Sequence, residues 1–151
     1  LEHLFLNTDE EGDSVNKAKE KLKYPPMPHA VFSSPQIAGV GATQQELETD
    51  GLKEDEDFII AKHEFIKTGM GMAMKDDTGM VKRIVDVKTK KLLGAHIVGE
   101  KAADIIHLLI GAMTWEKTVG ELLDVIYIHP ALSEVIKGAL KKIEYQFAMR
   151  G

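Results

Sequence analysis

Apolar and polar residues alternate in short runs over the first two thirds of the chain, whereas apolar residues recur every three or four positions over the last third. Alternation is typical of β-strands, and the wider spacing is typical of helices. Strands are predicted over the following ranges: Ala30–Ser33, Ile37–Gly41, Asp57–Phe65, Met72–Lys75, Met80–Val87 and Leu92–Val98. Short polar turns join the last three of these strands, so we expect them to form an antiparallel meander.

Helices are predicted where capping residues precede apolar positions at helical spacing. Thr43 and Glu46 have the spacing of a capping box, as have Thr118 and Glu121, and each pair marks the start of a short helix. A longer helix is predicted over Glu100–Met113. The final helix carries its apolar residues on one face: Leu132, Ile136, Ala139, Leu140, Ile143 and Phe147. The predicted fold class is α+β, in which an antiparallel sheet packs against helices.

The N-terminal part of the chain differs in character from the rest. Leu1–Leu6 is a short apolar run and Asn7–Lys23 is rich in charged residues, which predicts a linker with a possible helix over 15–22. The prolines of Tyr24–Pro28 favour extended backbone, so the compact domain is predicted to cover residues 24–151. Residue 1 is leucine and not methionine, from which we expect that the chain is an excised piece of a longer protein.

Composition narrows the class of protein. With 151 residues, of which 44% are hydrophobic and 28% charged, the chain has the size and composition of one globular domain. Its net charge of −5 argues against nucleic acid as a partner, and no apolar run approaches the ~18 residues that a membrane span requires. Cysteine is absent, which excludes disulfides and a thiol nucleophile of the chain's own and fits a cytoplasmic location.

The segment from Ile128 to Glu134 is the strongest candidate for chemistry. Pro130 restricts the backbone of His129, which stands immediately before the final helix, and Glu134 falls in the first turn of that helix. A contact from Glu134 to the imidazole could fix one tautomer and raise the basicity of the other nitrogen, as in a general base. The same spacing also fits a structural loop histidine beside a helix-capping acid.

The other histidines give weaker signals. His96 lies in a predicted strand and His107 in a predicted helix, so both are interpreted as structural residues. His3, His29 and His63 show no spacing that converges with one another or with carboxylates, and no metal site is predicted. Trp115 and Tyr127 are interpreted as core or interface aromatic residues.

Three motifs resemble one known family. The sequence from His129 to Glu134 is HPALSE, which resembles the HPTxSE signature at the end of the pyridine nucleotide-disulfide oxidoreductases, the flavoenzyme family of dihydrolipoamide dehydrogenase, glutathione reductase and mercuric reductase. The segment Pro28–Gly41 resembles the opening of the family's C-terminal domain, and Leu93–Gly99 resembles its central strand. These motifs lie in the family's order from about Tyr24 to the C-terminus.

The resemblance implies a C-terminal dimerisation domain, with residues 1–23 as the tail of a preceding FAD-binding region and a connecting insertion. In such enzymes the histidine of one subunit serves the redox-active dithiol of the other, so His129 and Glu134 are implied to act as an acid–base dyad in trans. His129 and Pro130 are implied to border the partner's flavin. Ala131 departs from the common threonine, but the dyad itself is intact.

The resemblance also implies what this chain does not carry. It has no GxGxxG fingerprint and no CxxxxC pair, so FAD and NAD(P) are expected on the parent enzyme and not on this chain, which by itself should be colourless and inactive. A homodimer is expected, and the favoured substrate is a disulfide of the lipoamide type. Three alternatives stay open: a pure assembly module without a catalytic role, part of a mercuric reductase-like enzyme, and an independent ligand- or metal-binding α+β protein.

Overall fold

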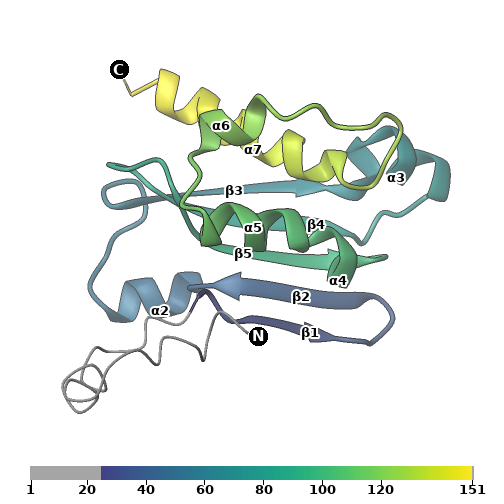
Figure 1. The fold of residues 1–151 in the computed structure, drawn as a ribbon, viewed down its shortest axis with the longest axis horizontal. Helices are drawn as coiled ribbons and strands as arrows, with labels where there is room; N and C mark the ends of the chain where they lie inside the picture. Colours follow the sequence, from purple (N-terminus) through teal and green to yellow (C-terminus); the bar gives the residue numbers. More distant parts are fainter. Residues whose placement is uncertain (1–24, 151) are drawn as a thin grey trace, which may run out of the picture.

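The computed structural model describes residues 25–150, so the linker and helix predicted within residues 1–23 lie outside the described part. Its centre is a five-stranded sheet with the order β1-β2-β5-β4-β3, in which all neighbouring strands are antiparallel (Figure 1). The strands are β1 (Pro28–Val31), β2 (Gln36–Gly41), β3 (Phe58–Glu64), β4 (Met80–Asp86) and β5 (Leu92–Gly99). The predicted α+β class is confirmed.

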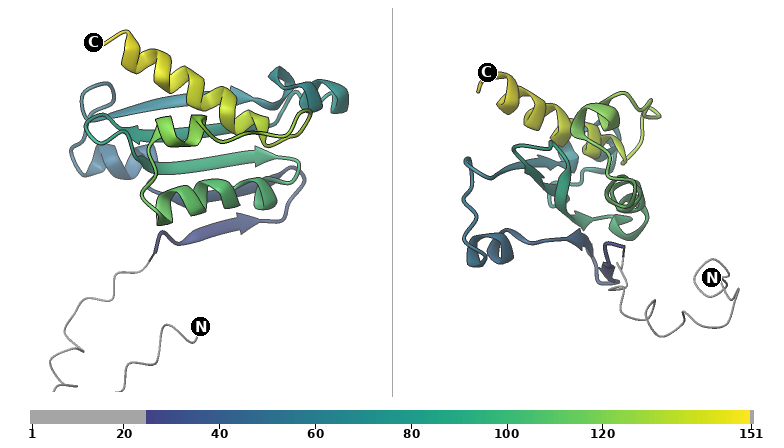
Figure 2. Two further views of the ribbon diagram at one scale, coloured as in Figure 1. Left: turned by 45° about the horizontal axis from the view of Figure 1, so that its top comes forward. Right: turned by 60° about the vertical axis from the view of Figure 1, so that its left-hand side comes forward.

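Helices cover the two faces of the sheet unequally. In Figure 2, α5, α6 and α7 lie together on one face, whereas α2 lies on the other side of the sheet. The helical segments are α2 (Gln44–Thr49), the 3-10 turn η2 (Phe65–Lys67), α3 (Gly69–Met74), α4 (Ala102–Ile105), α5 (His107–Thr114), α6 (Val119–Leu123) and α7 (Glu134–Ala148). Within residues 25–150 there is no helix with the length and apolar character of a membrane span.

Strand alternation divides the buried apolar residues into two clusters. On the covered face, residues such as Ala95 and Ile97 of β5 pack with Leu109 of α5 and Leu140 of α7. The opposite face has a small cluster in which Leu47 of α2 contacts Phe58 and Ile84. The side of the sheet away from α5 and α7 is therefore only partly covered.

One predicted strand is wrong. The segment Met72–Lys75 belongs to helix α3 and not to the sheet. The hydroxyl of Thr68 accepts a hydrogen bond from the backbone N–H of Gly71 at 3.0 Å, which caps this helix, and Lys75 ends it in the left-handed conformation with φ 56°. The meander itself is present, but β3 is its first strand, followed by β4 and β5.

The predicted helix over Glu100–Met113 is divided in two. Lys101 has a left-handed φ of 56°, so α4 begins after it, and a break at Ile106 separates α4 from α5. Close packing at Gly94 of β5 leaves no room for a side chain. A Cβ atom there would lie 1.9 Å from the carbonyl oxygen of Ala42, and the β4–β5 register shifts beside it.

Helix α7 is held against β3 and β4 by an apolar stripe and by one polar contact. Its buried residues are Val135, Ile136, Ala139, Leu140 and Ile143. Arg83 of β4 is fully buried and donates a hydrogen bond from Nη2 to the carbonyl oxygen of Ile136. Burial lowers the pKa of Arg83 to about 9, and its Nε and Nη1 atoms have no hydrogen-bond partner among residues 25–150.

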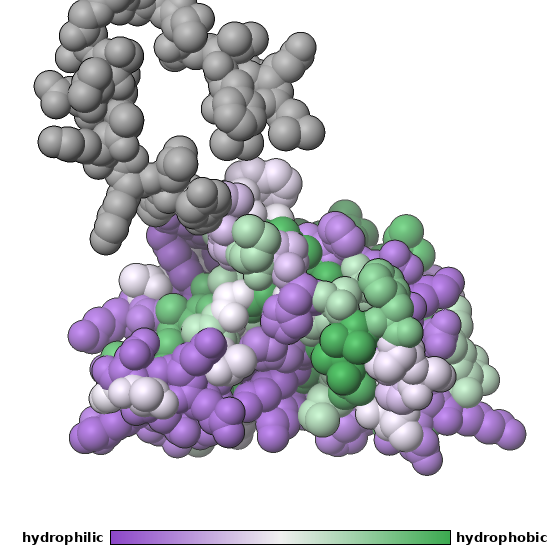
Figure 3. Space-filling view, turned by 90° about the horizontal axis from the view of Figure 1, so that it is seen from below, coloured by the Kyte–Doolittle hydropathy of each residue, from purple (hydrophilic) through white to green (hydrophobic). Residues whose placement is uncertain are grey.

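Several apolar side chains are exposed in the isolated chain. On the face seen in Figure 3, apolar residues gather between hydrophilic ones. Val31, Phe32 and Ile37 are exposed around the β1–β2 turn, and Ile126 and Ile128 are exposed in the segment before α7. Trp115 is 73% exposed, which excludes the core role that was one of its two interpretations. Such surfaces commonly mark contacts with other protein segments.

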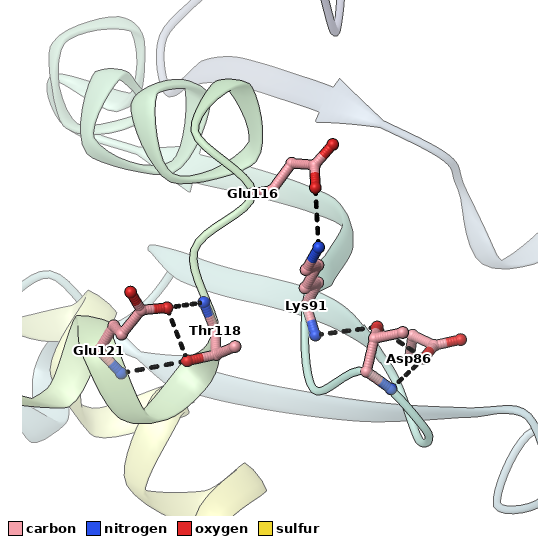
Figure 4. Close-up of polar contacts among 6 residues, drawn as sticks. Asp86, Lys91, Glu116, Thr118 and Glu121 are labelled. Carbon is pink, nitrogen blue, oxygen red and sulfur yellow. Dashed lines mark hydrogen bonds and ion pairs between the residues drawn. The ribbon is translucent and has the colours of Figure 1, made fainter.

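The two predicted capping boxes are confirmed. At α6, the carboxylate of Glu121 accepts a hydrogen bond from the backbone N–H of Thr118 at 2.8 Å, and the Thr118 hydroxyl accepts one from the N–H of Glu121 at 3.4 Å (Figure 4). Lys117 also donates to Glu121 at 2.8 Å. The contact with Lys117, followed by those with Thr118, lowers the pKa of Glu121 from 4.5 to about 2.

This capping box should make stability depend on pH in the acid range. Because the pKa of Glu121 is lower in the folded state, its contribution is complete above pH 4.5 and is lost as the pH falls toward 2. Glu121→Gln removes the titrating group, so the unfolding free energy of the variant should fall less steeply over this interval. Urea titrations between pH 5 and 2 test this, and parallel curves for the two proteins would contradict it.

Candidate functional site

An irregular loop over residues 124–133 carries His129 between α6 and α7. The Tyr127 hydroxyl donates a hydrogen bond to the carbonyl oxygen of Leu122 at 3.2 Å, which fixes this half-buried ring against the body of the domain. Its neighbours Ile126 and Ile128 point the other way and are 93% and 78% exposed. The His129–Pro130 peptide bond is cis. The segment therefore presents His129 on the surface between exposed apolar residues and α7.

His129 and Glu134 form the predicted contact. Nδ1 of His129 lies 3.0 Å from Oε1 and 3.1 Å from Oε2 of Glu134. The backbone N–H of Ala131 also donates to Oε2 at 3.0 Å. A carboxylate can only accept hydrogen bonds, so Nδ1 carries the proton and Nε2 keeps its lone pair. This is the tautomer in which an imidazole can act as a base through Nε2.

The surroundings of Glu134 keep it ionised. The hydrogen bond from Ala131 is the main cause that lowers the pKa of the Glu134 carboxyl, and the hydrogen bond from His129 adds to it. Glu134 is also the first residue of α7, where the helix dipole favours a negative charge. The charged carboxylate can stabilise the imidazolium that forms when His129 takes up a proton.

The imidazole of His129 rests on the start of α3. A Cβ atom on Gly69 would lie 3.2 Å from Cε1 of His129 and 3.6 Å from Cβ of Pro130, so the absence of a side chain at Gly69 leaves room for the ring. The His129 side chain is 72% exposed, against 23% for Glu134. Among residues 25–150, Nε2 makes no hydrogen bond. Glu134 and Gly69 thus hold the imidazole of His129 in place, while much of the ring stays exposed to solvent.

A basic pocket adjoins the dyad behind Glu134. It has a volume of about 230 Å³ and is lined by His63, Lys67, Thr68, Gly69, Glu134, Lys137, Gly138 and Lys141. Burial is the main cause that lowers the pKa of His63, whose ring lies against Gly138 of α7. This volume is below the range usual for sites of drug-sized ligands, and His129 is not part of the lining. Glu134 therefore borders this pocket, whereas the imidazole of His129 lies outside it.

The remaining histidines are distributed over the fold. His96 donates from Nε2 to the carbonyl oxygen of Ala42 at 3.1 Å, and Nδ1 of His107 lies 3.3 Å from the carbonyl oxygen of Asp104, in agreement with structural roles. His29 lies beside His96, with ring centroids 6.4 Å apart, a proximity that the sequence spacing did not indicate. In the described part of the chain there is no group of three or more metal-ligating side chains.

The fold and the dyad together define a class: an α+β domain that presents a pre-oriented histidine–carboxylate pair at its surface. Residues 27–140 match the family profile described as "Pyridine nucleotide-disulphide oxidoreductase, dimerisation domain". The chain belongs to this family. The resemblance inferred from the three sequence motifs is thereby confirmed.

Curated relatives carry the same domain within longer chains. The chain is 41% identical over 115 residues to the mycothione reductase of Mycobacterium tuberculosis, covering 76% of this chain and 24% of the relative. It is 37% identical over 114 residues to the dihydrolipoyl dehydrogenase of Rhizobium etli, covering 76% of this chain and 23% of the relative. The chain thus spans about a quarter of the length of these relatives.

Solved structures share the fold. The Cu(II) complex of the HOCl-induced flavoprotein disulfide reductase RclA from Escherichia coli superposes with a TM-score of 0.73 at 23% identity, over 87% of this chain and 29% of that one. LpdA from Mycobacterium tuberculosis gives a TM-score of 0.73 at 20% identity, over 86% of this chain and 28% of that one. In both structures the matching region is again a fraction of the whole chain.

The tautomer of His129 offers a direct test of the dyad. Glu134→Ala removes the acceptor of the Nδ1 proton, so the ring should shift toward the Nε2–H tautomer that free imidazoles prefer. Two-bond ¹⁵N–¹H spectra at alkaline pH, where histidines are neutral, distinguish the two forms. Glu144→Ala, on an exposed position of α7, serves as the control and should leave the wild-type pattern. An unchanged Nδ1–H form in Glu134→Ala would contradict the assignment.

Proposed function

We propose that the chain acts as the C-terminal dimerisation domain of an FAD-dependent NAD(P)H:disulfide oxidoreductase. In this role it supplies His129 and Glu134 to the redox-active dithiol of the partner subunit. The observation that carries the proposal is the form of the dyad: Glu134 fixes Nδ1 at 3.0 Å, while Nε2 makes no hydrogen bond within residues 25–150 and the side chain is 72% exposed. An oriented base with an open side is suited to a reaction centre supplied by another chain.

Exposed apolar residues beside the dyad support a homodimer. Ile126 and Ile128 are 93% and 78% exposed and lie close to His129 along the chain. Burial of such side chains removes apolar surface from water, which favours association at about 25 cal/mol per Å². A symmetric contact through residues 124–129 would cover these apolar side chains. It would also bring the dyad of each subunit close to the partner subunit.

The residues of this chain are suited to lie next to a bound flavin but not to bind one. FAD and NAD(P) belong, in the proposal, to other domains of the parent enzyme, since the chain has no dinucleotide-binding motif and its length is a quarter of that of the curated relatives. His129 and Pro130 form an exposed edge that can border the partner's flavin, as the exposure of the ring allows. The bound flavin would supply the electron transfer to the disulfide.

The dyad supplies proton transfer. Nε2 of His129 takes up a proton from a thiol, which leaves the more nucleophilic thiolate, and returns a proton when a thiolate has to leave as a thiol. The Glu134 carboxylate stabilises the imidazolium between these steps and holds the ring in one orientation. The hydrogen bond from the backbone N–H of Ala131 lowers the pKa of Glu134 and keeps its carboxylate ionised. The negative charge that stabilises the imidazolium is therefore present throughout the proton transfer.

The substrate proposed is a low-molecular-weight disulfide of the lipoamide type. The dihydrolipoyl dehydrogenase relative at 37% identity supports it, and a mycothiol-type disulfide is the second candidate because a mycothione reductase is 41% identical. A mercuric reductase-like parent is a weaker candidate, since the relatives compared above are a mycothione reductase and a dihydrolipoyl dehydrogenase. A pure assembly role, with His129 as an inherited loop residue, is the alternative that experiment has to separate.

Substitution of the histidine in the parent enzyme separates these roles. His129→Gln should lower turnover of the disulfide by roughly 10²–10⁴-fold, the usual contribution of a general acid–base, while the dimer persists. Steady-state kinetics with lipoamide and with mycothiol disulfide, together with light scattering, provide the readouts. His107→Gln, at an exposed position of α5, is the control. Unchanged turnover in His129→Gln would leave the assembly role as the correct one.

The proposed contact surface can be tested on the chain itself. The double substitution Ile126→Lys and Ile128→Lys places two charges on the exposed segment and should convert a dimer at micromolar concentration into a monomer. Sedimentation velocity measures the change, with circular dichroism to verify the fold. Gln45→Lys on α2, on the opposite side of the sheet, is the matched control and should remain dimeric. A dimer that survives both isoleucine changes would place the interface elsewhere.

A further inference from the structure

Two histidines meet on the sparsely covered face of the sheet. The pairing registers place His29 of β1 opposite Gly39 of β2, and Gly39 opposite His96 of β5. The three residues therefore form one row across three strands and project to the same face. The central residue has no side chain, so the two rings approach each other over it, with centroids 6.4 Å apart and planes inclined at 41°.

Nitrogen atoms of both rings converge on the space above Gly39. A Cβ atom on Gly39 would lie 2.6 Å from Nε2 of His29 and 2.8 Å from Nδ1 of His96. Nε2 of His96 faces the other way and lies 3.1 Å from the carbonyl oxygen of Ala42. A carbonyl only accepts, so Nε2 of His96 carries the proton and Nδ1 presents its lone pair toward His29.

This arrangement has the features of a metal-binding pair. Histidines that bind a metal through one nitrogen usually donate the other N–H to a backbone carbonyl or carboxylate, which fixes the ring, and His96 already makes such a contact. His29 is exposed, so its ring can turn outward from the backbone toward an ion. Imidazole nitrogens bind zinc, nickel and copper ions at about 2.0–2.1 Å.

We propose that His29 and His96 form a surface site for a divalent transition metal ion, with Nε2 of His29 and Nδ1 of His96 as ligands. Cu²⁺ should bind most tightly and Zn²⁺ more weakly, as the order of affinities for nitrogen ligands predicts. The described residues supply no third histidine or carboxylate ligand, so water completes the coordination shell. The ion lies above Gly39, on the outward side of the rings.

The charges around the pair are mixed. Lys82 of β4 lies opposite His96 in the strand register, but its ammonium group donates to the side-chain oxygen of Gln44 at 2.7 Å and is thereby held toward α2. Glu46, also on α2, carries a negative charge. The pKa of its carboxyl is lowered mainly by the hydrogen bonds with Thr43 and to a small extent by His96. Both charged groups are thus engaged by residues of α2 or its cap, and the two imidazoles are the ligands of the proposed site.

The site differs from the dyad in position and chemistry. His129 lies beside α3 and α7, whereas His29 and His96 lie on strands that pair through β2, on the face away from α7. The inference therefore does not depend on the proposed redox function.

Titration of the chain with Cu²⁺ and Zn²⁺, followed by calorimetry, tests the site. The wild-type chain should bind one Cu²⁺ whose electron paramagnetic resonance spectrum shows two nitrogen ligands. His29→Gln, which removes an exposed ligand, should weaken Cu²⁺ binding at least tenfold. Gly39→Ala should do the same, because its methyl group occupies the space between the rings while both histidines remain.

Two further variants decide where an ion binds. His107→Gln removes an exposed histidine from α5 and should leave the affinity unchanged. His129→Gln should also leave it unchanged, because the dyad is not part of the site. Equal affinities for His29→Gln and His107→Gln would overturn the proposal, as would loss of binding in His129→Gln with retention in His29→Gln. Circular dichroism confirms that each variant is folded.

Discussion

The packing of α7 on β3 and β4 is the constraint from which the candidate site follows. An apolar stripe buries one side of the helix, and Arg83 donates to the carbonyl oxygen of Ile136 within its first turn. A buried guanidinium with unpaired donors is costly, so the contact that Nη2 of Arg83 makes with the helix is a constraint on how α7 packs. Here it holds the end of the helix on which Glu134 stands, two residues before Ile136. The core thus places the start of the helix that carries Glu134, and the loop adds the hydrogen bond from Ala131 to the carboxylate.

The His129–Glu134 dyad is held in place by neighbouring residues, while the imidazole remains exposed to solvent. Glu134 is held by the core through α7 and by the N–H of Ala131, and the ring of His129 is backed by Gly69. Nothing in residues 25–150 encloses Nε2 in a substrate pocket. In the proposed function a second surface would complete the site, and the chain belongs to a family of dimerisation domains.

Local sequence signals predicted the elements that local interactions determine. Thr43 with Glu46 and Thr118 with Glu121 marked helix starts correctly, and the apolar spacing of the last helix identified the face that α7 buries. The contact of His129 with Glu134 was also predictable, because both residues lie within one turn of a helix start. Met72–Lys75 was wrongly predicted as a strand, because a short apolar run fits a strand as well as a helix and the cap at Thr68 was not recognised. Neither the packing of His129 on Gly69 nor the approach of His29 to His96 could be predicted, since both depend on contacts between segments that are distant in the chain.

The hydrogen bond from residue 131 to Glu134 comes from the peptide backbone. The side chain at this position is therefore free to vary, and the alanine found in place of the threonine of the HPTxSE signature leaves the carboxylate in place. Only proline, which has no N–H to donate, would remove the contact. An alignment would count Ala131 as a departure from the signature. The backbone hydrogen bond to Glu134 is nevertheless available to nineteen of the twenty amino acids at this position.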